Sequence, residues 1–218
     1  MELPLNENLG SITVESDEAS DPVGVVIIAH GAGAGMHHPF MFDLSKEISS
    51  MGFHAVRFNF PYMEEGRKSP GSPKKNIEAW GLVIEHVHDK YPELPLFLSG
   101  KSYGGRMASH LLAENEIDYV KGIFYLGFPL HAPGKDSKDR ADHLNKVQVP
   151  QLFLQGVKDK LANIVLMHEV VENLKKGSLI EIEAADHSFN VPKKVGISKR
   201  EMIQRLASLS VDFIKKIM

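Results

Sequence analysis

A serine lies at the centre of the motif Gly-Lys-Ser-Tyr-Gly at positions 100–104. The apolar run before it, 93–99, is typical of a short strand, and 106–114 is typical of a helix. A serine on such a sharp strand-to-helix turn has a strained backbone, and its hydroxyl stands clear of the sheet. A hydroxyl becomes a useful nucleophile when a histidine accepts its proton and a carboxylate orients that histidine. The motif therefore predicts nucleophilic chemistry at Ser102.

The two partners that such a serine needs follow it along the chain. Asp159 comes three residues after the apolar run 152–156, and His187 follows the run 179–183. Each residue comes just after a predicted strand, so we expect all three to gather at one edge of a sheet. We predict that Ser102 attacks, His187 acts as the base and Asp159 orients His187.

Other residues compete for these roles. Three carboxylates lie in a charged loop before Asp159 and are typical of solvated side chains: Asp136, Asp139 and Asp142. Asp186 adjoins His187 and is expected to point elsewhere. Five of the 11 histidines are typical of surface residues: His37, His38, His86, His88 and His168. No pair of them has the spacing of a metal site on one helix face.

Acyl chemistry also needs two backbone N–H groups aimed at the negative charge that develops on the substrate oxygen. The N–H of Tyr103, at the start of the predicted helix, is one candidate. The second is expected from the glycine-rich loop His-Gly-Ala-Gly-Ala-Gly at 30–35, where Ala32 is favoured and Gly33 comes next. The alternative interpretation of this loop is a purely structural turn.

Strands and helices alternate along the chain, which predicts an α/β fold with a doubly wound, mostly parallel sheet flanked by helices. Strands are expected at 11–15, 23–29, 53–60, 93–99, 120–127, 151–156 and 178–183, and helices at 39–51, from 72, at 106–114, 163–175 and 198–217. The loops 61–72 and 128–149 leave the carboxyl ends of strands but are too short to form a cap domain. We therefore expect one domain over residues 1–218, with a shallow, open site.

Composition narrows the function classes. The formal net charge of −3 does not favour a nucleic-acid or acidic-membrane partner. The chain has no cysteine, which excludes disulfides and thiolate catalysis. No secretory signal or membrane-spanning run is evident, so we expect a cytoplasmic protein. The motifs checked for phosphate, dinucleotide and metal binding are incomplete, and we expect no cofactor and no metal.

The whole set of motifs resembles a small, capless α/β hydrolase, similar to the dienelactone-hydrolase-like group. A closer likeness is to the subgroup named after a testis-expressed protein and a subunit of a histone-acetyltransferase complex. The segments that carry the likeness are 57–62, 100–106, 127–135 and 154–159. The resemblance implies the hydrolase fold and a Ser-His-Asp triad.

We therefore expect a serine hydrolase that cleaves a carboxylic ester or thioester through an acyl-enzyme, with a small-molecule acyl substrate. The alternatives are a non-catalytic interaction protein on the same scaffold, for which nothing in the sequence specifies a protein partner, and an acyltransferase or peptidase using the same triad. Three arginines are candidates for binding an anionic substrate group, although structural or solvated roles are favoured for them: Arg57, Arg67 and Arg106.

Overall fold

A single eight-stranded sheet runs through the protein, as seen in a computed structural model that describes residues 1–218. Its strand order is β1-β2-β4-β3-β5-β6-β7-β8. The strands are β1 (Glu2–Asn6), β2 (Gly10–Asp17), β3 (Val25–Ala29), β4 (His54–Phe58), β5 (Leu96–Lys101), β6 (Val120–Leu126), β7 (Gln151–Gly156) and β8 (Gly177–Ile182). From β4 to β8 all neighbours are parallel, whereas β1 and β2 pair antiparallel at one edge.

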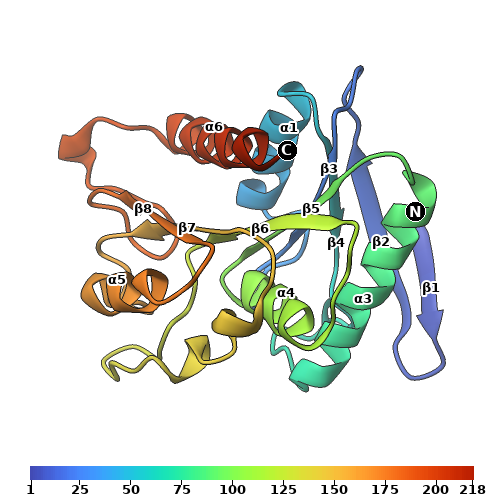
Figure 1. The fold of residues 1–218 in the computed structure, drawn as a ribbon, viewed down its shortest axis with the longest axis horizontal. Coiled ribbons are helices and arrows are strands. Elements are labelled where there is room, and N and C mark those ends of the chain that lie inside the picture. The colour runs from blue at the N-terminus through green and yellow to red at the C-terminus, as the bar shows by residue number, and fades with distance from the viewer.

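Helices cover both faces of this sheet. Figure 1 shows α1 and α6 on one face and α3, α4 and α5 on the other. The helices are α1 (Pro39–Ser50), α2 (Pro61–Glu64), α3 (Pro73–Lys90), α4 (Tyr103–Glu114), α5 (Ile164–Glu172) and α6 (Lys199–Ile217). The mostly parallel, doubly wound sheet predicted from the sequence is therefore confirmed.

The two faces of the sheet bury two separate apolar cores. The larger has 32 buried residues and includes Trp80 and Met107 from α3 and α4. The smaller has 21 and includes Leu44 and Leu206 from α1 and α6. The central strand β3 is buried along its whole length, because helices cover both of its faces. This explains why its sequence is a continuous apolar run rather than an alternating one.

The N-terminal edge differs from the sequence prediction. Residues Glu2–Asn6 form β1, which was not predicted, and β2 extends over Gly10–Asp17 where only a weak strand at 11–15 was expected. Pro4 argues against a strand in general, but an edge strand tolerates proline because one side of it needs no hydrogen bonds. The segment 61–72 likewise contains the short helix α2, which begins at Pro61.

The loop 128–149 is also partly ordered into single turns. Two 3-10 turns lie within it, at Asp139–Ala141 and Leu144–Lys146. A third, Lys193–Val195, precedes α6. None of the helices combines the length and the apolar character needed to cross a lipid bilayer.

Candidate active site

Ser102 lies between β5 and α4, at the carboxyl edge of the sheet. Its backbone has φ of +50°, a region that residues other than glycine rarely adopt. Such strain persists only when the surrounding structure enforces it, and it is frequent at functional sites. The turn places the hydroxyl of Ser102 at the start of α4, where the helix N-terminus favours negative charge.

Gly100 and Gly104 make this turn possible, because at both positions another backbone segment lies too close for a side chain to fit. A Cβ added to Gly100 would lie 2.1 Å from the nitrogen of Gly105. A Cβ added to Gly104 would lie 2.6 Å from the carbonyl oxygens of Ala29 and His30. Neither neighbour is a flexible side-chain end, so both positions require glycine for steric reasons.

The structure brings Ser102, His187 and Asp159 together. His187 Nε2 lies 2.9 Å from Ser102 Oγ, and His187 Nδ1 lies 2.7 Å from Asp159 Oδ2. A carboxylate accepts hydrogen bonds, so Nδ1 of a neutral His187 carries the proton and Nε2 is free to accept one from Ser102. The three residues follow β5, β7 and β8, as the sequence pattern predicted.

Three donors fix the orientation of the Asp159 carboxylate, whose side chain is fully buried. Besides His187, the Nε2 of Gln155 donates to it at 2.6 Å and the backbone N–H of Leu161 donates at 2.7 Å. The competing Asp186 accepts instead from the backbone of Ser188 and Asn190. Asp159 is therefore the carboxylate that contacts the His187 ring.

The remaining competing carboxylates lie away from His187. Asp136 accepts from the Nδ2 of Asn163 at 2.6 Å. Asp139 begins a 3-10 turn and Asp142 follows it, on the loop before β7. None of the three contacts His187.

The two candidate oxyanion donors are both available for a substrate. Tyr103 is the first residue of α4, so its N–H has no acceptor within the helix. Ala32 is exposed, and its N–H makes none of the hydrogen bonds of the loop in which it lies. Gly33, the second choice, has φ of +75°, which turns the loop.

A buried histidine orients the peptide that carries the Ala32 amide. His30 Nδ1 donates to the carbonyl of Gly31 at 2.8 Å, and His30 Nε2 accepts from the N–H of Phe60 at 3.1 Å. Burial lowers the pKa of His30 to about 4, so the ring is neutral at pH 7 and can make both bonds. The Gly31 carbonyl and the Ala32 N–H belong to one planar peptide and point in opposite directions. Holding the carbonyl therefore aims the N–H.

A cavity of about 320 Å³ opens beside Ser102 and His187. Its apolar wall comes from Ala34, Phe40, Met41 and Leu161. His38 is exposed, as the sequence predicted, and also lines the cavity, and its side chain caps α1 by accepting from the N–H of Phe40. The signal that could have found His38, Phe40 and Met41 is their place at the start of the helix after the glycine-rich loop.

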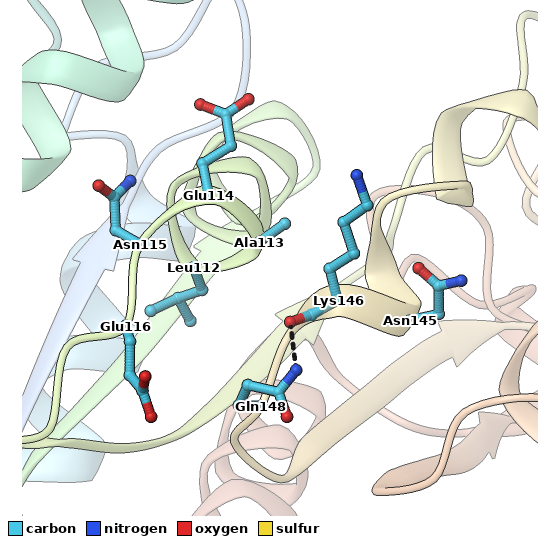
Figure 2. Close-up of a pocket in the computed structure, with 8 residues that line it drawn as sticks. All are labelled: Leu112, Ala113, Glu114, Asn115, Glu116, Asn145, Lys146 and Gln148. Carbon is cyan, nitrogen blue, oxygen red and sulfur yellow. Dashed lines mark hydrogen bonds between the residues drawn. The ribbon is translucent and has the colours of Figure 1, made fainter.

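A second hollow lies at the other end of α4 (Figure 2). It has a volume of about 520 Å³ and is lined mainly by polar and charged residues: Leu112, Ala113, Glu114, Asn115, Glu116, Asn145, Lys146 and Gln148. The one hydrogen bond among them joins Gln148 Nε2 to the Lys146 carbonyl. It lies about 18 Å along the helix from Ser102, at about 1.5 Å per residue. It is larger than the cavity at Ser102 but contains neither a serine nor a histidine.

The three arginines differ in their surroundings. Arg57 is buried and pairs with Asp17 at 3.2 Å, which gives it a structural role. Arg67 pairs with Glu65 on the surface. Arg106 lies four residues after Ser102 on α4, its Nε is buried without a hydrogen-bond partner, and burial lowers its pKa. None of the three lines the cavity at Ser102.

No group of three or more His, Asp or Glu side chains is arranged to hold a metal ion.

Comparison with known proteins shows which family and which solved structures this chain is similar to. The model of a family described as "Alpha/beta hydrolase domain" matches residues 22–215. The chain is similar in structure to a dienelactone hydrolase from Anabaena variabilis, with a TM-score of 0.81 and 18% identity over 100% of this chain and 96% of that one. It is also similar to an α/β serine hydrolase homologue from Coxiella burnetii, with a TM-score of 0.74 and 18% identity over 94% of this chain and 96% of that one.

A third similar structure is a member of the α/β serine hydrolases without a lid, from Xanthomonas campestris. Its TM-score is 0.68, with 21% identity over 94% of this chain and 92% of that one. At these identities the likeness establishes the fold. Because the family model matches nearly the whole chain, the protein belongs to the α/β hydrolase domain family.

Proposed function

We propose that the protein is a serine hydrolase that cleaves a carboxylic ester or thioester through an acyl-enzyme on Ser102. The observation that carries this proposal is the unbroken hydrogen-bond chain from Ser102 Oγ through His187 to Asp159. The order of these residues along the chain, Ser, Asp, His, is that of the α/β hydrolases. The carboxylesterase type is our proposal from this site and not a property transferred from the similar structures.

In the first half of the reaction, Ser102 Oγ attacks the carbonyl carbon while its proton moves to His187 Nε2. The carbonyl oxygen becomes an oxyanion, which the N–H groups of Tyr103 and Ala32 would hold. Asp159 stabilises the imidazolium through Nδ1. Collapse of the tetrahedral intermediate breaks the bond to the leaving group, and His187 returns the proton to the departing alcohol or thiol.

In the second half, water takes the place of the leaving group. His187 removes a proton from this water, which attacks the acyl carbon and releases the acid, and Ser102 regains its proton. The His187 side chain is 24% exposed, so water can reach it.

The cavity supports a substrate with a short or medium acyl chain. Its volume of about 320 Å³ is near the lower end of the roughly 300–1,000 Å³ typical of small-molecule sites. Its apolar wall suits an uncharged acyl chain. We also propose that the chain falls in the subgroup named after the testis-expressed protein, on the strength of segments such as 100–106 and 154–159.

A fluorophosphonate probe tests this function directly, because it forms a stable adduct only with an activated serine. We expect a single adduct, located on Ser102 by intact mass and peptide mapping, and none on Ser102→Ala. A panel of p-nitrophenyl esters and thioesters of increasing acyl length should then show a preference for short or medium chains over long ones. A folded wild-type protein that forms no adduct would favour the non-catalytic scaffold instead.

A further inference from the structure

The loop that carries His187 has a strained backbone. Ala184 has φ of +58° and Phe189 has φ of +60°, and neither is a glycine. Non-glycine residues occupy this region only when surrounding contacts determine the conformation. The loop Ala184–Phe189 must therefore be held by specific interactions.

Some of these interactions lie within the loop and its flank. The Asp186 carboxylate accepts from the N–H groups of Ser188 and Asn190, both at 2.9 Å. The ring of Phe189 stacks on Phe40 at a centroid distance of 5.9 Å. These contacts fold the loop on itself and against α1, but none of them connects it to the strand that carries Ser102.

One side chain makes that connection. Lys101, the last residue of β5, donates from Nζ to the carbonyl of His187 at 2.6 Å. The same ammonium lies 5.4 Å from the centre of the Phe189 ring. Lys101 immediately precedes Ser102, so a single residue links the backbone of the nucleophile to the backbone of the base.

The ammonium of Lys101 lies in a crowded site beside the ring of His187. A Cβ added to Gly127, which follows β6, would lie 3.2 Å from Nζ and 3.5 Å from His187 Nδ1, so the ammonium and the imidazole share a narrow space above this glycine. No carboxylate lies within 4.0 Å of Nζ. Burial lowers the pKa of Lys101 to about 8, an effect that the charges of Asp159 and Asp186 partly offset.

We propose that Lys101 is a positioning residue that fixes the distance between His187 and Ser102 by holding the His187 carbonyl. This inference rests on the proposed function, since it concerns the same reaction. It assigns a role to the variable position before the nucleophile in Gly-x-Ser-x-Gly. Because Lys101 acts through His187, its loss should affect every ester substrate alike.

The decisive experiment compares Lys101→Met, which keeps the length but removes the donor, with Lys101→Arg, which keeps a cationic donor. Lys175→Met is the matched control, because Lys175 is exposed, makes no hydrogen bond and carries the same charge. For each variant, kcat and KM are measured on two neutral esters of different acyl length. Hydrogen exchange of residues 184–190 is measured on the same proteins as a readout that needs no activity.

We expect Lys101→Met to lower kcat about 100-fold on both esters, the size of effect that a displacement of about 1 Å produces. KM should stay within about twofold, exchange in 184–190 should quicken about tenfold, and Lys101→Arg should recover part of both. Circular dichroism confirms that each variant is folded. Unchanged kcat with unchanged exchange in a folded Lys101→Met would overturn the proposal, as would a loss confined to one ester.

The two proposals fail in different ways. If wild-type protein hydrolyses no ester and forms no adduct, the proposed function fails, while faster exchange of 184–190 in Lys101→Met would still support the positioning role. If wild-type protein is active and Lys101→Met matches it in both readouts, the positioning role alone fails.

Discussion

The loop that carries His187 and the loop that carries the Ala32 amide are each held by one side chain, but the two side chains differ in charge. The loop Ala184–Phe189 carries His187, has a strained backbone and is held by a partly buried cation, Lys101. The loop 30–35 carries the Ala32 amide and is held by a buried neutral ring, His30. In both, a side chain fixes one backbone carbonyl and thereby aims a functional group. The difference is that, in the proposed mechanism, the first loop carries the ring that moves a proton, whereas the second only has to present an N–H.

The largest expected effect on kcat comes from replacing Ser102, the nucleophile with which the groups on both loops are proposed to act. Ser102→Ala should lower kcat by about 10⁶-fold, because neither loop can act without the nucleophile. The fold should persist, since the change removes one hydroxyl. Steady-state ester hydrolysis and thermal melting check this. Wild-type turnover in this variant would contradict the mechanism.

The next largest expected effect on kcat comes from replacing Asp159, the carboxylate that contacts His187. Asp159→Asn should lower kcat by about 10⁴-fold, because an amide at this position favours the wrong tautomer of His187. Asp142→Asn is the matched control and should retain full activity. A loss in Asp142→Asn or Asp136→Asn, with activity kept in Asp159→Asn, would show that the acid is assigned wrongly.

Replacing His30, which holds the loop 30–35, should lower kcat less than replacing Asp159. His30→Phe keeps a ring of similar size but loses both hydrogen bonds, so the Gly31–Ala32 peptide is no longer fixed. We expect kcat to fall about 10- to 100-fold, less than the roughly 100- to 1,000-fold cost of deleting an oxyanion donor. His143→Phe is the control, because His143 is a partly buried histidine that bonds Ser109 on α4, away from the loop 30–35. It should lose stability while keeping kcat, and equal loss of kcat in both variants would refute the role of His30.

The last effect concerns how stability depends on pH, which is a separate quantity from turnover. The pKa of His30 falls from about 6.5 in the unfolded chain to about 4 in the folded one. Between these values the unfolded chain binds more protons, so stability falls as the pH drops from 6.5 to 4. The share from His30 is about 3 kcal/mol. Urea unfolding at pH 7 and pH 4 should show a smaller drop for His30→Phe than for wild type, and an equal drop would show that His30 is not the group that titrates.

The sequence predicted the fold and the three residues that the structure brings together, because these signals are local. Ser102 is marked by its own turn, and Asp159 and His187 each follow an apolar strand. The contact of Lys101 with the His187 carbonyl was not predicted, because it depends on how segments far apart in sequence meet above the sheet. The strand β1 was missed because an edge strand can be polar and contain Pro4.

The close backbone contacts at Gly100 and Gly104 also separate two kinds of mutational cost within one motif. A side chain at either glycine would collide with backbone, so such variants should accumulate as less folded protein. A change at Ser102 should leave the amount of folded protein intact and remove only turnover. In a deep mutational scan, variants at positions 100 and 104 should therefore score low in an assay of protein abundance. Variants at position 102 should score low only in an assay of activity.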